Sequence, residues 1–415
     1  MTTVEMPAPV TRRKMPGWAA SMLVVVVGLL VLSIVATLTG QLQLTSAGTA
    51  QAALYLLLPI LFAALGGVWS ERAGVINLGL EGMMILGTWG AAWAGFQWGP
   101  WAALLVGGVF GALGGLLHAV ATVSFGVNHI VSGVAITLLG AGVTKYLSTL
   151  VFLPISNNPR QSPPMRGFED FSITPLTELL DVLVRSNTVF VTDVAGLLKG
   201  LLTGLTPVVL LAVVAVPATF LVLWRTAFGL RLRSCGENPV AAESLGVSVY
   251  AHKYVAVVVS GFLAGLGGAA LVLNPGQLGY LEGQTGGRGY IGLAAMIFGN
   301  WRPGGALAGS ALFGYVDALQ LRAGGDAVHA LLYGGAIIAV LVAVLWFGRR
   351  NWQAGAIALA AGLAVYVIYS LTESIPSQFA AFAPYIVTLV VLAVASQRLR
   401  PPAANGMEYR RGEGD

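Results

Sequence analysis

The sequence predicts an all-α polytopic membrane protein with about 10–12 transmembrane helices. Hydrophobic residues make up 56% of the 415 residues and charged residues only 9%, whereas soluble domains carry about 25% charged residues. The apolar residues also gather in runs of about 20, the length that an α-helix needs to cross a bilayer. The 55 glycines fit this class, because small residues let transmembrane helices approach closely. Gly107, Gly111 and Gly115 form such a stripe, for which helix packing is the simplest role.

The first apolar run extends from Trp18 to about Thr39 and follows three basic residues, Arg12, Arg13 and Lys14. This pattern is similar to a secretory signal, but the apolar part of a signal has only about 7–15 residues. We therefore predict an uncleaved first helix. By the same length criterion, the next spans are expected near residues 49–69, 76–96, 100–123, 129–151, 204–224 and 254–273.

A second group of apolar segments completes the chain. Residues 290–299 are too few to cross the bilayer as a regular helix. Full spans are expected after them, at 304–321, 327–347, 352–371 and 380–396.

Basic residues in short loops predict the orientation, since Lys and Arg are retained on the cytoplasmic side of a membrane. With the N-terminus inside, the loops with Arg72, Arg302, Arg349 and Arg350 fall on that side, and so does the C-terminus. The predicted organisation is a cytoplasmic tail (1–17), a first transmembrane half (18–151), an extracytoplasmic loop (152–203), a second transmembrane half (204–398) with a cytoplasmic loop at 225–253, and a cytoplasmic tail (399–415). The outer loop is either a cap over an external entrance or a plain connection.

The cytoplasmic loop at 225–253 contains the signals of a short helix. Asn238 suits the N-cap, Pro239 the first helical position and Gly246 the stop. With Glu243 exposed, such a helix at the membrane surface is a shape that another protein can bind. The alternative is an ordinary solvated loop.

Two segments indicate an inverted repeat with discontinuous helices. GLEGMMILGTW at 79–89 matches GLAAMIFGNW at 292–301 if one residue is skipped, and the predicted topology gives the two opposite directions across the membrane. Inverted repeats commonly place the substrate near the midplane, between interrupted helices. The alternative is chance similarity, because apolar segments match one another easily.

The first polar motif is SERAGVINLGLEG at 70–82. Asn77 and Glu81 are four residues apart and share one helical face. A charge inside a bilayer costs roughly a few kcal/mol, so these side chains should face the bundle interior. They either line a translocation path or form an interhelical clamp.

The second motif is GGRGYIGLAAMIFGNWRPGG at 286–305, a short apolar helix with a break at Asn300. It is either a broken helix beside the pathway or two helices joined by a tight turn.

Four more polar residues are candidates, Asn128 with His129 and Asp317 with Gln320. They either line a vestibule or act as interfacial caps. Trp89 belongs to an outer aromatic cluster that is either an interfacial belt or a platform for a planar ligand.

Missing motifs narrow the function further. The chain has no GxxxxGK[ST] loop to hold ATP phosphates, no HExxH and no GxSxG. The single cysteine, Cys235, excludes an internal disulfide framework and a multi-cysteine metal site. The net charge of +5 lies mainly in loops and tails, where it sets orientation, so we expect no nucleic-acid partner.

Three segments resemble the permease subunits of bacterial ATP-binding-cassette importers of the branched-chain amino acid and ribose type, and within them the nucleoside importers. They are residues 70–82, 230–247 and 296–322. The resemblance implies a chain without its own cofactor in the bacterial cytoplasmic membrane, in contact with lipid. Its implied partners are an ATPase subunit that binds the ATP, a second permease subunit that makes a heterodimer, an external substrate-binding lipoprotein and a nucleoside.

In this family the helix at 239–245 docks into a groove on the ATPase. The residues that the resemblance assigns to this coupling are Glu237, Asn238, Pro239, Ala241, Ala242, Glu243, Leu245 and Gly246. The chain departs from the family pattern by an extra hydrophobic pair at about 328–371 and by the long outer loop.

The preferred interpretation is therefore a non-enzymatic permease subunit, with Asn77, Glu81, Trp89, Asn128 and Asn300 as candidate pathway residues. The alternative is an ion-coupled secondary transporter of a small polar solute, with Glu81 or Asp317 as the coupling acid. A membrane-embedded enzyme would have to rely on Glu169 and Asp170 in the outer loop, which more simply form a solvated surface.

Overall fold

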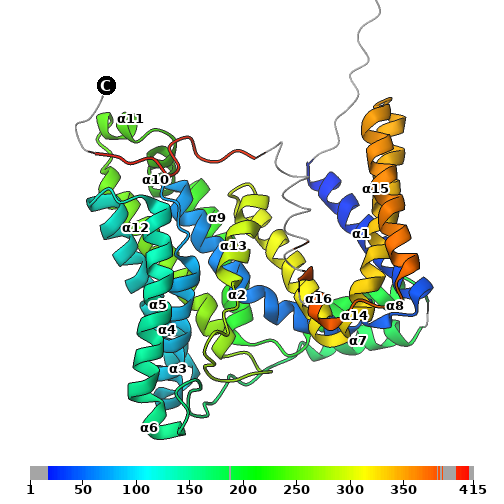
Figure 1. Ribbon diagram of the computed structural model, residues 1–415, viewed down its shortest axis with the longest axis horizontal. Helices are drawn as coiled ribbons and strands as arrows, with labels where there is room; N and C mark the ends of the chain where they lie inside the picture. The colour runs from blue at the N-terminus through cyan, green and yellow to red at the C-terminus, as the bar shows by residue number, and fades with distance from the viewer. Residues whose placement is uncertain (1–16, 187, 381, 384–385, 387–398, 411–415) are drawn as a thin grey trace, which may run out of the picture.

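The computed structural model describes residues 17–186, 188–380, 382–383, 386 and 399–410 (Figure 1). Within these residues, seven helices are long and apolar enough to cross a membrane. They are α2 (Ala47–Arg72), α4 (Pro100–Ala119, continued by a π-helical turn at Val120–Ser124), α5 (His129–Val151), α9 (Pro207–Arg225), α12 (Val249–Val272), α14 (Pro303–Gly348) and α15 (Trp352–Leu371). The protein is thus an all-α polytopic membrane protein, as predicted.

Other helices complete or connect these spans. They are α1 (Gly17–Thr39), α3 (Leu80–Trp98), α6 (Leu153–Ser156), α7 (Thr174–Arg185), α8 (Val191–Leu202), α10 (Ala227–Glu237), α11 (Pro239–Ser244), α13 (Arg288–Phe298) and α16 (Ser377–Ala380), with a 3₁₀ turn at Leu42–Thr45. Most of the predicted N-terminal tail and of the last span at 380–396 lies outside the described residues.

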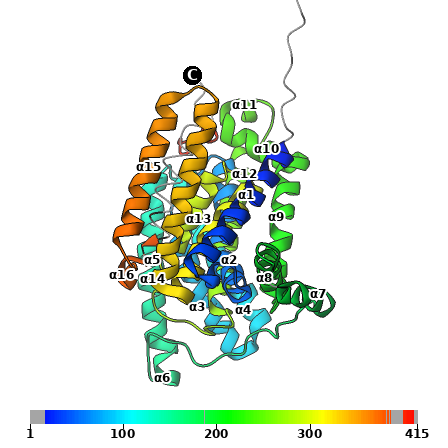
Figure 2. The same ribbon diagram turned by 90° about the vertical axis from the view of Figure 1, so that its right-hand side faces the viewer.

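The helices form two groups (Figure 1). α2 to α5, α9, α12 and α13 pack into one bundle, whereas α1, α15 and the second part of α14 stand on the other side of the molecule and face the viewer in Figure 2. α14 joins the groups and bends at Gly324, where φ is +62°. This bend separates the spans predicted at 304–321 and 327–347. The extra hydrophobic pair at about 328–371 consists of the second part of α14 and α15, which form a helical hairpin beside the bundle.

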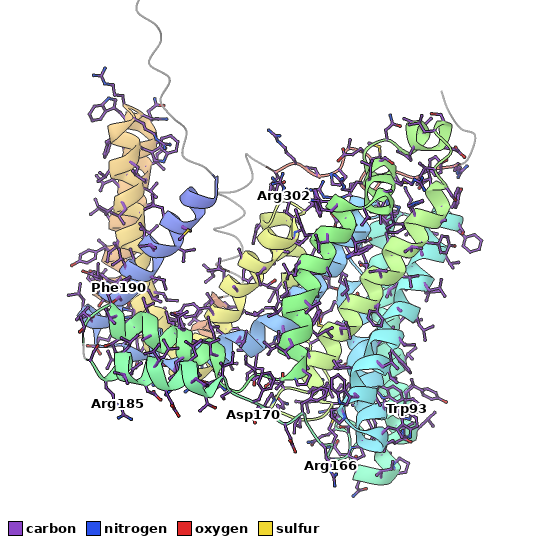
Figure 3. The ribbon with its side chains drawn as sticks, turned by 180° about the vertical axis from the view of Figure 1, so that it is seen from behind. Trp93, Arg166, Asp170, Arg185, Phe190 and Arg302 are labelled. Carbon is purple, nitrogen blue, oxygen red and sulfur yellow. The ribbon has the colours of Figure 1, made fainter. Side chains whose placement is uncertain are left out.

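Two opposite faces of the molecule differ in content. One carries α10, α11 and residues 399–410, and we call it the α11 face; the other carries α6 at the end of the bundle, with α7 and α8 below the second group of helices, and we call it the α6 face (Figure 1). Figure 3 shows Arg302 at the α11 face, and Arg166, Asp170 and Arg185 at the opposite face. The long loop predicted at 152–203 thus contains helices α6, α7 and α8.

Glycine contacts set the spacing of the bundle core. Gly111 of α4 packs against Gly265 of α12 so closely that an added Cβ would lie 2.5 Å from the Gly265 Cα atom. Gly115 packs on the backbone of α12 in the same way, and Gly107 packs on Ala91 of α3 and Ala269 of α12. The predicted small-residue stripe is therefore a helix-packing surface.

Candidate functional site

The chain between α2 and α3 leaves the helical conformation inside the bundle. Gly74 has a φ of +84°, and the Asn77 Oδ1 atom accepts the N–H of Gly79 at 3.1 Å. The Asn77 amide donates to the Ser260 hydroxyl of α12 at 2.9 Å. The span predicted to begin at residue 76 therefore begins at Leu80, because the Asn77 turn takes the place of its first helical turn.

Glu81 joins this break to a second interrupted helix. It is buried in the first turn of α3, and its carboxylate accepts the N–H groups of Gly287 at 2.9 Å and Gly289 at 2.7 Å. These two amides lie at the N-terminus of α13. A helix N-terminus has unsatisfied N–H groups and a partial positive charge. The carboxylate accepts two of these N–H groups and offsets the partial positive charge, which explains how an acid is accommodated inside the bundle.

α13 runs from this contact toward the α11 face. At its start, a Cβ added to Gly289 would lie 2.6 Å from the Glu81 Cα atom. Farther along, Gly292 packs on the middle of α2. Beyond its end, Arg72 at the last residue of α2 donates to the Trp301 carbonyl at 3.0 Å. α13 is thus a half-length helix that begins inside the molecule, as the sequence predicts for residues 290–299.

α3 runs from the same contact toward the opposite face, where Gly95 packs on Met165. The two interrupted helices therefore start at one contact and run toward opposite faces of the bundle; the inverted repeat itself stays a prediction. The sequence match of 79–89 with 292–301 does not align the starts of the two helices, because Gly79 precedes α3 whereas Gly292 lies inside α13.

An ion pair lies beside the α13 N-terminus. Arg288 donates to the Asp317 carboxylate of α14 at 2.8 Å, and the two side chains are 19% and 18% exposed. A second Arg288 nitrogen donates to the Gln284 carbonyl at 3.3 Å. Asp317 is among the residues predicted from the sequence, whereas Arg288 is not, because its glycine-rich segment resembles a surface loop. Glu81 and Asp317, the acids of the ion-coupled alternative, both have partners within the chain.

The other predicted pathway residues lie apart from this contact. Trp89 is buried between helices and donates its indole N–H to Ser148 at 3.0 Å. Asn128 caps α5 at the α11 face. Asn300 lies in the turn between α13 and α14, with a φ of +54°, and accepts the N–H of Arg400 at 2.9 Å. Of the five candidates, only Asn77 and Glu81 belong to the region where the interrupted helices meet.

α11 is the short surface helix predicted from the sequence. Asn238 caps it by accepting the Ala241 N–H at 3.0 Å, Pro239 is its first residue, and Gly246 ends it with a φ of +79°. Ala242 is buried in a small cluster with Cys235 and Val249. On the outer side Leu245 is 84% exposed. The helix is therefore fixed to α10 and α12 by one side, and Val240 and Leu245 are exposed on the other.

Residues 399–410 cross the α11 face as an irregular segment, which we call the C-terminal strap. Glu243 is half-buried rather than exposed, because the strap residue Tyr409 donates its hydroxyl to the Glu243 carboxylate. Glu237, at the end of α10, accepts the Ala403 N–H at 3.2 Å. Pro239 and Ala403 are among the residues of a groove of about 360 Å³ between α11 and the strap. The sequence carried no signal for this contact.

Within the described residues, no group of three or more His, Cys, Asp or Glu side chains is arranged to hold a metal ion. Glu169 and Asp170, the acids of the enzyme alternative, lie in an exposed part of the segment before α7. Several buried side chains instead make hydrogen bonds between segments, such as Asn77 with Ser260 and Trp89 with Ser148.

Comparison with known proteins defines the family. Guanosine ABC transporter permease protein NupQ of Bacillus subtilis is 31% identical over 86% of this chain and 94% of that protein. Nucleoside ABC transporter permease protein NupC of Lactococcus lactis is 33% identical over 85% of this chain and 93% of its own length. Putative glucose ABC transporter permease protein TsgC13 of Haloferax volcanii is 38% identical over 66% of this chain and 76% of its length.

No solved structure matches the chain. The family model described as branched-chain amino acid transport system / permease component matches residues 49–341, which include both interrupted helices, α11 and the first part of the extra hairpin. The chain therefore belongs to this family of membrane-embedded transport permeases.

Proposed function

We propose that this chain is the transmembrane permease subunit of an ATP-driven importer that moves nucleosides across the cytoplasmic membrane of a bacterium. The observation that carries this proposal is the similarity to two nucleoside permeases along about nine-tenths of their lengths. The ATP is bound by a partner subunit, because the chain has no phosphate-binding loop. The chain itself is not an enzyme.

The α11 face supplies the site for the ATPase. α11 is short, fixed on one side and apolar on the other, and the residues expected to contact the ATPase are those from Glu237 to Gly246. The same face carries Arg302 and Arg233, which agrees with a cytoplasmic position. A second permease subunit completes the membrane pore, lipid surrounds it, and an external lipoprotein delivers the nucleoside at the α6 face.

The meeting point of α3 and α13 is the proposed moving part of the pathway. Closure of the ATPase would displace α11 and, through α12, the contact between Ser260 and Asn77. The same displacement would act on Glu81, whose two hydrogen bonds hold the interrupted helices together. Transport would then alternate between states in which these helix ends are joined and separated.

The test is reconstitution of this chain with an ATPase subunit, a second permease subunit and a substrate-binding lipoprotein, the three partners proposed here. We expect the ATPase to copurify with this chain, and we expect uptake of guanosine or another nucleoside into proteoliposomes to require ATP and the lipoprotein. Uptake that continues without ATP and stops when an ionophore dissipates the ion gradient would refute the importer and favour ion-coupled transport.

A hexose is the second candidate substrate, because TsgC13 is 38% identical over two thirds of this chain. The two candidates differ in a competition experiment. If the substrate is a nucleoside, unlabelled guanosine should abolish binding of labelled nucleoside to the lipoprotein, whereas a hundredfold excess of glucose should leave it unchanged. Binding of glucose alone would reject the nucleoside.

A further inference from the structure

The C-terminal strap makes contacts with three separate elements of the α11 face. Besides the contact with Glu243, the strap N–H groups of Ala404 and Gly406 donate to the carbonyls of Gly236 (2.9 Å) and Gly74 (3.2 Å). Gly236 belongs to α10, which leads into α11, and Gly74 belongs to the break between α2 and α3. The strap therefore bridges the surface helix and the interrupted part of the bundle.

Asn405 anchors the middle of the strap in the bundle. Its side-chain amide donates to the Glu71 carboxylate at 2.8 Å. The same carboxylate oxygen accepts the indole N–H of Trp301 at 2.6 Å, and Glu71 is only 3% exposed. Glu71 lies two residues before the break, and Trp301 lies in the turn that follows α13. A single buried carboxylate thus joins the strap to the end of α2 and to the turn that follows α13.

Tyr409 anchors the other end of the strap at α11. Besides its hydroxyl contact with Glu243, its ring lies 5.8 Å from that of Tyr250, near the start of α12. Lys253 places its ammonium 5.7 Å from the centre of the same ring. Tyr409 therefore contacts the helices on both sides of the turn that follows α11, and its ring contacts do not depend on its hydroxyl.

We propose that the C-terminal strap positions α11 relative to the α2–α3 break, so that Asn405 and Tyr409 are positioning residues for the transmission of ATPase movement to the interrupted helices. This inference rests on the proposed function for its link to ATP, but the positioning itself is a property of this chain. α10 itself packs against the break, since a Cβ added to Gly236 would lie 3.0 Å from the Gly74 nitrogen. The strap adds a second connection, which reaches Glu243 of α11 through Tyr409 and Glu71 of α2 through Asn405.

The first experiment measures positioning in the chain alone, in lipid nanodiscs. Nitroxide labels at Ser244→Cys in α11 and Phe125→Cys in the turn after α4 report one distance across the α11 face; both positions are exposed. We expect a narrow distance distribution in the otherwise native chain. Tyr409→Phe removes the hydroxyl that contacts Glu243 and keeps the ring, and Asn405→Asp places a second carboxylate beside Glu71. Both variants should broaden or shift the distribution.

Met407→Leu is the matched control, because Met407 lies on the same strap and is 59% exposed. It should leave the distribution unchanged. If Tyr409→Phe and Asn405→Asp both give the native distribution, the strap does not position α11 and the inference is wrong. This distance measurement does not depend on ATPase binding. A failure of the proposed function would be seen separately, because the native chain would then not copurify with the ATPase.

The second experiment measures the number of substrate molecules transported per ATP hydrolysed by the reconstituted importer. We expect both strap variants to keep ATPase copurification and basal ATP hydrolysis, and to lose transport per ATP by about fivefold or more, the range typical of coupling between sites. A general folding defect would instead reduce copurification, hydrolysis and transport together. An unchanged transport-to-ATP ratio in both variants would overturn the role of the strap in transmission.

Discussion

At the scale of single residues, the buried polar side chains are explained by their partners in distant segments. Asn77 and Glu81 were selected from the sequence because polar groups inside a bilayer require an internal partner. The partners of Glu81 are more than 200 residues away along the chain. Helical spacing relates only residues that are close in the sequence. The sequence therefore predicts that Glu81 has an internal partner, but not that the partner is the start of α13.

The contact at Glu81 leads to the first prediction. Glu81→Gln removes the negative charge and turns one N–H acceptor into a donor. Each hydrogen bond to a charged group contributes about 1.5–3 kcal/mol, and the charge also stabilises the helix N-terminus. We expect the free energy of unfolding in detergent to fall by about 1.5–3 kcal/mol, and ATP-driven uptake to fall with it.

Glu282→Gln is the control for this substitution. Glu282 has a charged partner instead of two backbone amides, Arg160 at 3.5 Å, but that arginine is 77% exposed, and exposed ion pairs contribute about 1 kcal/mol or less. The control should change stability and uptake little. Equal effects of the two substitutions would show that the contact between Glu81 and α13 is not important for the fold.

At the scale of helices, the α4–α12 contact depends on glycine, which leads to the second prediction. Gly111→Val introduces side-chain atoms where even a Cβ would overlap the backbone of α12. Overpacking of a well-packed core costs about 1–3 kcal/mol, occasionally more. We expect a thermal unfolding midpoint well below that of the native protein. Gly142→Val is the control, because no other atom lies within 4 Å of a Cβ there; a similar loss at both positions would contradict the packing explanation.

The cap of α11 leads to the third prediction. Asn238→Ala removes the side-chain acceptor of the Ala241 N–H, and the loss of an N-cap costs about 1 kcal/mol. Because α11 has only six residues, we expect fraying of the helix and weaker copurification of the ATPase. Asn351→Ala removes the same kind of cap from α15, where it accepts the Ala354 N–H at 3.2 Å. This control should retain the ATPase; equal loss from both variants would contradict a specific role of α11.

Helices were easier to predict from the sequence than the segments between them. The bounds of α11 followed from Asn238, Pro239 and Gly246, because capping is a local property of the chain. The late start of α3 and the path of the strap were missed. Both depend on contacts with side chains and carbonyls far away in the sequence, and neither segment shows a helical or strand periodicity.

At the scale of the whole molecule, the two faces carry different kinds of segment. The α11 face holds short, basic turns, the surface helix and the strap, and the α6 face holds the amphipathic helices α7 and α8 (Figure 1). Seven spans were recognised from hydropathy, since length and composition determine whether a helix crosses a bilayer. Their packing into a bundle with a separate hairpin was not predicted, because apolar sequence does not specify its neighbours.

The orientation of these faces in the membrane is the subject of the last prediction. Short basic loops are retained in the cytoplasm, so we expect the α11 face inside and the α6 face outside. Ser244→Cys in α11 and Glu178→Cys in α7 place an exposed thiol on each face. The native Cys235 adds little background, because burial raises the pKa of its thiol to about 11 and the thiolate is the reactive form.

In right-side-out membrane vesicles, a membrane-impermeant maleimide should label Glu178→Cys but not Ser244→Cys. After permeabilisation both variants should be labelled, which shows that each thiol is accessible on its own side. The native chain, with Cys235 alone, should stay unlabelled in both conditions. Labelling of Ser244→Cys in sealed vesicles would place α11 outside, where a cytoplasmic ATPase cannot reach it. That single outcome would contradict both the orientation and the proposed coupling, because the two rest on the same basic face.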